Sequence, residues 1–375
     1  MIALETDACR LFGVKYPIVQ TGMGWVAGAR LTAATSAAGG LGILASATMT
    51  YDELVTAIHN VKERTDKSFG VNLRSDQSDV DDRIALIVSE GVKVASFAQA
   101  PGERLVKMLK DQGVVVMPTI GAPRHAEKVA KWGVDAVIAQ GAEGGGHTGT
   151  VPTSLLIPAV TRSVDIPVLG AGGFSDGRGL VAALAWGAAG IAMGTRFLLS
   201  AESTVPEDIK RRYLAAGIND TIVTKSVDGY PQRVIRTELV DHLTGSGRLT
   251  ALPRAGLNAL RFRSMTGMSV GALLREGLAM KKSEGLTYAQ VAMAANAPML
   301  TKAALVDGRI DAGVLPTGQV VGVIDSLPTV AEIIASVIAE AEETIARLSG
   351  AAPVDKPVDK PGDKPGDSAL GGLSE

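Results

Sequence analysis

The sequence predicts an α/β fold: a (β/α)8 TIM barrel with an appended helical lid or subdomain. Three observations favour it, namely eight short apolar runs, amphipathic stretches between them, and glycine-rich segments directly after several runs. Each run is apolar or β-branched and is bounded by glycine, proline or a polar residue, as buried parallel strands are. The runs are residues 17–22, 41–46, 69–74, 92–97, 114–119, 135–141, 166–173 and 190–195.

The stretches between these runs have helical periodicity. Leu54, Ile58 and Val61 share one face of residues 51–65, and residues 124–133 end on a glycine. Eight strand-then-helix units favour a closed barrel. An open doubly wound sheet is the alternative. It more often carries its glycine motif after the first strand, whereas here glycines follow the first, sixth, seventh and eighth runs.

The pattern changes after the eighth run. We expect an FMN-binding barrel core over residues 1–205 and a mostly helical lid or substrate subdomain over residues 206–326. Residues 327–350 have the apolar stripe of an amphipathic helix, which we expect to pack on the barrel. Residues 351–375 contain a charged repeat with Lys-Pro pairs and predict a disordered tail.

Composition excludes several classes of protein. The 375 residues carry a net charge of −2, which gives no argument for nucleic acid or an anionic membrane. The single cysteine, Cys9, excludes an intrachain disulfide, and the four scattered histidines give no metal-site spacing. The sequence shows no apolar signal segment and no membrane-length apolar run, so we expect a cytoplasmic protein.

The loops after the seventh and eighth strands of such barrels commonly bind phosphate. Here they read "GAGGFSDGRG" and "MGTRF", in which glycines allow backbone N–H groups to approach an anion. Either loop alone is equally compatible with a tight turn, but both at the expected strands favour a phosphate group. The candidate residues are Ala171, Gly172, Gly173, Gly194 and Thr195.

FMN is the phosphorylated cofactor that best fits the remaining loops. Small residues in "QTGMGWVAG", residues 20–28, can lie against a flat ring. Asn72 and Gln140 follow the third and sixth strands, and their amides offer both donors and acceptors to the pyrimidine edge of a flavin. The alternative for Asn72 is an ordinary turn residue at the end of a strand.

A single histidine, His147, lies in the nearly side-chain-free segment "AQGAEGGGHTG", residues 139–149. Histidine titrates near neutral pH and can exchange a proton with a substrate. The surrounding glycines leave space for a flat ring. The alternative is a histidine that satisfies loop carbonyls, but the position after the sixth strand favours a catalytic role.

These motifs resemble those of the nitronate monooxygenase family, formerly called 2-nitropropane dioxygenases, whose barrel is shared with flavin-dependent enoyl-ACP reductases. The resemblance implies that FMN is bound non-covalently, with its phosphate at the two loops above, and that His147 is the active-site histidine. The motifs are "PIVQTGMGWVA" (17–27), "GVNLR" (70–74), "AQGAEGGGHTG" (139–149), "PVLGAGGFSDGRG" (167–179) and "AMGTRFLLSAES" (192–203). The implied flavin-binding residues are Gly22, Met23, Gly24, Asn72, Gln140, Gly145 and Gly149.

The family resemblance implies oxidation of a nitronate or nitroalkane by O2 to a carbonyl compound and nitrite. The loop after the fifth strand departs from this pattern. It reads "PTIGAP", residues 118–123, and includes the candidate substrate residue Thr119, where typical nitronate-oxidising members carry a basic, polar segment. The whole chain looks closer to an actinobacterial subgroup that resembles the FMN-dependent oxidoreductase of a hydroindanone CoA thioester in steroid ring degradation.

A basic insert gives an independent reason to consider a CoA thioester. Residues 253–282 carry six basic residues and one acidic residue, and they include Arg261, Arg263 and Arg275 as candidate contacts for CoA phosphates. The alternative is a basic face that packs against a partner subunit, as in a homodimer. The second functional hypothesis is therefore an FMN-dependent dehydrogenase or reductase of a bulky CoA thioester. The third is a non-catalytic flavin-binding protein, against which the titratable His147 argues.

Overall fold

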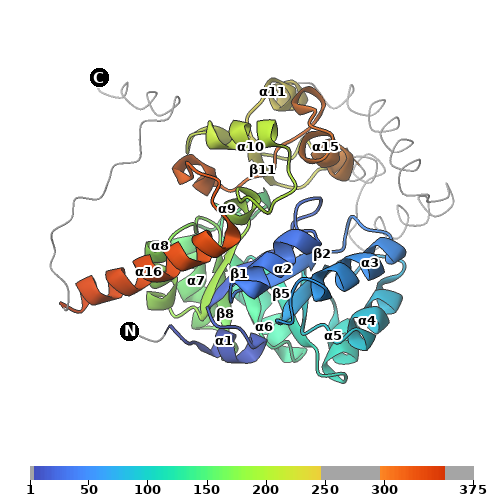
Figure 1. Ribbon diagram of the computed structural model, residues 1–375, viewed down its shortest axis with the longest axis vertical. Helices are drawn as coiled ribbons and strands as arrows, with labels where there is room; N and C mark the ends of the chain where they lie inside the picture. Colours follow the sequence, from blue (N-terminus) through green and yellow to red (C-terminus); the bar gives the residue numbers. More distant parts are fainter. Residues whose placement is uncertain (1–3, 246–295, 351–375) are drawn as a thin grey trace.

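The structure is a computed structural model that describes residues 4–245 and 296–350. Eight parallel strands close into a barrel in which β1 pairs with both β2 and β9 (Figure 1). All eight predicted runs form barrel strands, so the prediction of a TIM barrel is confirmed. The strands are β1 (Ile18–Gln20), β2 (Leu41–Ala45), β3 (Phe69–Leu73), β4 (Val94–Phe97), β5 (Val115–Ile120), β6 (Val137–Gln140), β8 (Val168–Ala171) and β9 (Gly190–Met193).

Helices surround the barrel. After β9 only a short helix follows, and the C-terminal helix α16 packs against both α8 and α2, so that it takes the place of an eighth barrel helix (Figure 1). The helices are α1 (Asp7–Phe12), α2 (Ala29–Ala37), α3 (Tyr51–Lys62), α4 (Val80–Ser89), α5 (Glu103–Lys110), α6 (Pro123–Lys131), α7 (Thr153–Thr161), α8 (Gly177–Ala185), α9 (Thr195–Leu198) and α16 (Val330–Leu348).

The core has two layers because side chains alternate along each strand. Val19, Ile43 and Met117 belong to a cluster inside the barrel, and Phe12 of α1 joins it from the amino ends of the strands. The intervening strand residues, such as Val71, face outward and pack against the helices. The alternation therefore decides which side chains at the carboxyl ends of the strands point into the barrel.

Further elements lie beyond the carboxyl ends of the strands, at the top of Figure 1. Two of them, β10 and β11, form an antiparallel hairpin that extends onto the two-residue strand β7. The sequence does not predict this hairpin, because the region has mainly helical periodicity and the two strands are only four residues long. The elements are α10 (Glu207–Leu214), β7 (Gly146–His147), β10 (Thr221–Thr224), β11 (Gln232–Ile235), α11 (Glu238–Gly245), α15 (Asn296–Leu305), η1 (Ile310–Ala312) and η2 (Gln319–Val323).

Two predicted features lie outside the described residues: the basic insert 253–282, with Arg261, Arg263 and Arg275, and the tail 351–375. Within the parts of the chain that the structure describes, no helix combines the length and apolar character needed to cross a membrane.

The contact between α8 and α16 depends on Gly177. A Cβ atom there would lie 2.3 Å from the backbone nitrogen of Ala341 and 2.4 Å from the carbonyl oxygen of Val337. We expect Gly177→Ala to separate the two helices, to lower the free energy of unfolding by about 1–3 kcal/mol and to lower Tm. Thermal unfolding followed by circular dichroism measures this. Gly121→Ala is the control, since a Cβ atom there meets no atom within 4 Å; equal Tm values for the two variants would contradict the prediction.

Candidate active site

Polar side chains point into the barrel at the carboxyl ends of its strands. Asn72 lies between the outward-facing residues Val71 and Leu73, so it faces inward, and its amide nitrogen donates to the Ser96 hydroxyl at 3.4 Å. Thr119 is the register partner of the interior residue Ile138, and Gln140 is the partner of the interior residue Ala171. Four strands thus place a polar layer at the mouth of an otherwise apolar barrel.

The loop after β1 lies against this layer. A Cβ atom on Gly22 would lie 2.4 Å from the Cβ atom of Asn72, which leaves no room for any side chain at position 22. On the opposite side, a Cβ atom on Gly194 would lie 3.4 Å from the sulfur of Met23. The structure therefore brings together four predicted cofactor-binding residues from the ends of β1, β3 and β9: Gly22, Met23 and Asn72 for the flavin, and Gly194 for the phosphate. Gly24 is close by, against Thr48.

The loop after β8 has a backbone that exposes its N–H groups. Gly172 and Gly173 have φ values of 95° and 84°, in the left-handed region that side chains disfavour. A Cβ atom on Gly172 would also lie 2.9 Å from the backbone nitrogen of Gly144. With no side chain at either position, an anion can approach the backbone N–H groups of this turn closely.

Residues 317–318 complete this region, although no sequence pattern predicts it. The Thr195 hydroxyl accepts a hydrogen bond from the Gly318 backbone nitrogen at 2.9 Å, and Thr317 is 1% exposed. A Cβ atom on Gly145 would lie 2.4 Å from the carbonyl carbon of Thr317. The loops after β6 and β9 are therefore held together by residues 317–318. A Thr-Gly pair in a loop carries no local signal for such a long-range contact.

Charges beside the glycine loops are already compensated. The Glu143 carboxylate accepts from the backbone nitrogen and the hydroxyl of Thr153, at 2.9 and 2.7 Å, and so caps the start of α7. Arg233 donates to the Ala142 carbonyl at 3.1 Å, and burial lowers the pKa of its guanidinium, an effect that the Glu143 carboxylate opposes. The Glu143 carboxylate therefore has hydrogen-bond donors at Thr153 and the opposite charge of Arg233 nearby.

The backbone of His147 is fixed from two sides. In the pairing of β7 with β11, His147 lies opposite Gln232 and Gly146 lies opposite Arg233. The Gln140 amide donates to the His147 carbonyl oxygen at 2.7 Å. Both strands and the barrel layer thus determine where the imidazole projects.

The imidazole is exposed but anchored at one nitrogen. Its side chain is 63% exposed, whereas that of Asp228 is 4% exposed, and His147 Nε2 lies 2.7 Å from Asp228 Oδ2. The Gln232 amide nitrogen lies 3.1 Å from the same ring nitrogen and also donates to Asp228. The Tyr230 ring meets the imidazole edge to face, with centroids 5.9 Å apart. No sequence pattern predicts that these three residues meet His147. The Asp-Gly pair at 228–229 is a turn signal, but it predicts only the hairpin and not the contact of Asp228 with the imidazole.

Some of the predicted site residues take no part in these contacts. A Cβ atom on Gly149 would meet no atom within 4 Å, so its neighbours do not require a glycine. Thr119 points into the barrel from β5, while the predicted arginines lie outside the described residues. The remaining predicted residues combine closely packed glycine loops, amide groups, a glycine turn that an anion can approach and one imidazole. This combination fits a planar phosphorylated cofactor with a proton acceptor beside it.

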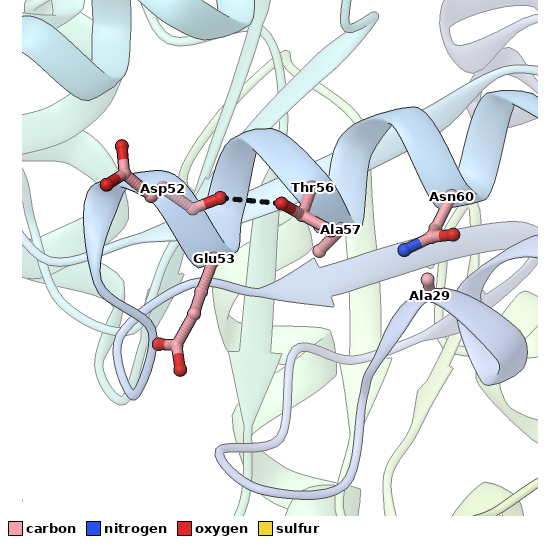
Figure 2. Close-up of a pocket in the computed structure, with 6 residues that line it drawn as sticks. All are labelled: Ala29, Asp52, Glu53, Thr56, Ala57 and Asn60. Carbon is pink, nitrogen blue, oxygen red and sulfur yellow. Dashed lines mark hydrogen bonds between the residues drawn. The ribbon is translucent and has the colours of Figure 1, made fainter.

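A pocket of about 440 Å³ borders the polar layer through Ala45, the register partner of Asn72. Its walls mix apolar residues, among them Trp25, Met49 and Leu305, with polar ones, among them Thr48 and Glu53. A second hollow, of about 360 Å³, lies over α3 on the outer surface (Figure 2). Its lining, which includes Asp52, Thr56 and Asn60, shares no residue with the site at the barrel mouth.

Comparison with protein families and curated proteins gives consistent similarities. A profile of the nitronate monooxygenase family matches residues 6–85 and 78–340. A Rhodococcus jostii protein named (3aS,4S,5R,7aS)-5-hydroxy-7a-methyl-1-oxo-octahydro-1H-indene-4-carboxyl-CoA dehydrogenase is 59% identical over 345 residues, which are 92% of this chain and 98% of that protein. A Mycobacterium tuberculosis protein of the same name is 58% identical over 90% of this chain and 96% of its own length. A probable nitronate monooxygenase of Staphylococcus saprophyticus is 31% identical over 63% of this chain and 80% of its own length.

Solved structures show the same architecture. FabK from Thermotoga maritima superposes with a TM-score of 0.74 at 35% identity and covers 93% of this chain and 99% of its own. A nitroalkane oxidase from Streptomyces ansochromogenes gives a TM-score of 0.71 at 26% identity, over 91% of this chain and 99% of its own.

Proposed function

Because the chain belongs to the nitronate monooxygenase family, we propose that it is an FMN-dependent dehydrogenase of a hydroindanone-carboxyl-CoA thioester. One observation carries this proposal: two proteins named as such dehydrogenases match at 59% and 58% identity over almost their full lengths. The relative named as a probable nitronate monooxygenase is 31% identical over 63% of this chain. The hypothesis placed second on the sequence alone is therefore the better supported one.

The residues at the barrel mouth fit FMN. Gly172, Gly173, Gly194 and Thr195 would hold its phosphate through backbone N–H groups and one hydroxyl. The close contact of Gly22 with Asn72 brings the loop after β1 against the polar layer, and the flat ring would lie against this loop. When bound, FMN supplies the acceptor for the two electrons that a dehydrogenase removes from its substrate.

His147 supplies the group that handles the proton. Removal of two hydrogens from a substrate releases a proton, which a base at the site must accept. The imidazole is 63% exposed and projects from the loop after β6, so a substrate lying over the barrel mouth can contact it. Its backbone is held by the pairing with Gln232 and by the Gln140 amide, directly after the glycines 144–146.

The pocket bordered by Ala45 offers room for a bulky ring system beside this site. At about 440 Å³, with Trp25, Met49 and Leu305 among its walls, it can take the apolar part of such a ring system, and the Glu53 carboxylate in its lining does not favour a small anion. Thr119 would contact the substrate from β5, and Arg261, Arg263 and Arg275 would contact the phosphates of CoA. The small nitronate anion needs neither feature.

Nitronate oxidation is the second candidate function. It is supported by the family profile, and the Streptomyces ansochromogenes nitroalkane oxidase shares the fold at 26% identity. The loop after β5 lacks the basic segment that the family resemblance associates with nitronate oxidation.

Anaerobic reduction of the flavin separates the two functions. We expect the 5-hydroxy-hydroindanone-carboxyl-CoA thioester to bleach the flavin absorbance of the purified holoprotein rapidly, because the pocket beside Ala45 would take its ring system and the proposed arginine contacts would take its CoA phosphates. Propionate 3-nitronate should bleach it slowly or not at all, and the ring acid without CoA is the control for thioester recognition. Stopped-flow absorbance spectroscopy measures the rates. Rapid bleaching by nitronate alone would refute the proposal in favour of the second candidate.

Replacing the imidazole tests the proton acceptor. We expect His147→Ala to retain bound FMN but to lower kcat by about 10²–10⁴-fold, the usual contribution of a general base. His125→Ala is the matched control, because His125 is an exposed histidine on α6. Steady-state turnover and the flavin-to-protein ratio are measured for both variants. Equal turnover of the two variants would assign His147 a structural role only.

Removing one hydroxyl tests the phosphate site. We expect Thr195→Val to raise the Kd for FMN by about tenfold or more, because a hydrogen bond to a charged group contributes about 1.5–3 kcal/mol. Fluorescence quenching during titration of the apoprotein with FMN gives the Kd. Thr56→Val, an exposed substitution on α3, should leave the Kd unchanged. An unchanged Kd for Thr195→Val would place the phosphate elsewhere.

A further inference from the structure

The buried carboxylate of Asp228 has no evident role in the packing of the barrel. It lies in the turn between β10 and β11, and one of its oxygens, Oδ1, accepts a hydrogen bond from the Tyr230 backbone nitrogen at 3.1 Å. Such a hydrogen bond, from the backbone nitrogen two residues later, is typical of an aspartate in a turn. The second oxygen, Oδ2, instead faces His147 Nε2 at 2.7 Å and also accepts from the Gln232 amide.

Burial of this carboxylate requires donors, since an unpaired buried charge is strongly unfavourable. The Asp228 side chain is 4% exposed, and its neighbours supply three donors: a backbone N–H, an amide and the imidazole. An ionised carboxylate only accepts hydrogen bonds. The hydrogen in its bond to His147 is therefore on Nε2, and the Gln232 amide nitrogen, which lies 3.1 Å from the same ring nitrogen, gives its hydrogen to Asp228 and not to the ring.

That hydrogen bond determines the tautomer of the neutral ring. With hydrogen on Nε2, the lone pair is on Nδ1. Among the described residues, the structure gives His147 Nδ1 no hydrogen-bond partner, while the side chain as a whole is 63% exposed. The ring nitrogen that is free to take a proton is thus Nδ1, which does not contact Asp228.

We propose that Asp228 is the positioning residue for His147 and that Nδ1 is the atom that accepts the substrate proton. This inference rests on the proposed function for its substrate, but the tautomer itself does not. In the proton transfer, the substrate's bond to hydrogen breaks and an Nδ1–H bond forms. The ring becomes an imidazolium whose positive charge lies beside the Asp228 carboxylate. The proton then leaves Nδ1 for solvent.

The tautomer can be measured directly, because the chain has only four histidines. The holoprotein is labelled with ¹⁵N-histidine, and the His147 signals are assigned by their loss in His147→Ala. In the neutral ring, which the ¹⁵N chemical shifts distinguish from an imidazolium, we expect hydrogen on Nε2 and a bare Nδ1. A neutral ring that carries hydrogen on Nδ1 overturns the assignment. This result does not depend on which substrate the protein uses.

Kinetics supply the second readout. Asp228→Asn keeps the shape of the side chain, but its amide can donate to Nε2 and so stabilise the tautomer with hydrogen on Nδ1. We expect kcat to fall by about 10²–10⁴-fold while KM and the FMN content stay unchanged. The substrate is whichever compound reduces the flavin. If neither compound does so, the proposed function fails and the tautomer measurement alone decides the role of Asp228.

Asp220→Asn is the matched control for Asp228→Asn. Asp220 also accepts a backbone hydrogen bond in a turn of the same region, from Gly217 at 2.8 Å, but contacts no atom of His147. It should leave kcat unchanged. A fall in FMN content or a rise in KM for Asp228→Asn, with kcat preserved, would assign Asp228 a purely structural role and overturn the proposal.

Discussion

Two residue pairs, Gln232 with His147 and Arg233 with Gly146, connect the appended hairpin to the loop after β6. The organisation of the mouth of the barrel depends on this pairing. It places Gln232 beside the imidazole, brings the β10–β11 turn with Asp228 against it, and lets Arg233 reach the Ala142 carbonyl. The glycine-rich loop has few side chains of its own, so without the pairing little would fix its conformation.

Periodicity and turn chemistry were sufficient to predict the barrel. Each strand is a run of buried apolar residues, which is the pattern expected of a parallel strand that is covered on both faces. The same reasoning located Asn72 and Gln140 at strand ends, and the alternation of side chains along β3 and β6 points both into the barrel. Local sequence determines these features because the barrel imposes one orientation on every strand.

Long-range contacts explain what the sequence did not reveal. Asp228 is 81 residues from His147, and Gly318 is 123 residues from Thr195, although each pair is joined by a hydrogen bond. No spacing rule connects such positions, since their proximity arises from β7–β11 pairing and from the close approach of Gly145 to Thr317. The hairpin strands themselves are four residues each, too short for periodicity to distinguish them from helix. The choice of substrate was similarly hidden, because the flavin motifs are common to both candidate functions.

The division of the site between barrel and hairpin has a consequence for how such a protein can change. The glycine loops after β8 and β9 belong to the barrel, whereas the groups that orient the imidazole belong to a hairpin inserted after it. Substitutions in the β10–β11 turn can therefore change the surroundings of the imidazole while the glycine loops after β8 and β9 keep their sequence. The histidine itself belongs to the barrel loop, so a graft of β10–β11 from one barrel of this type to another would exchange the partners of His147 and leave the histidine in place, provided that the pairs of Gln232 and Arg233 are kept.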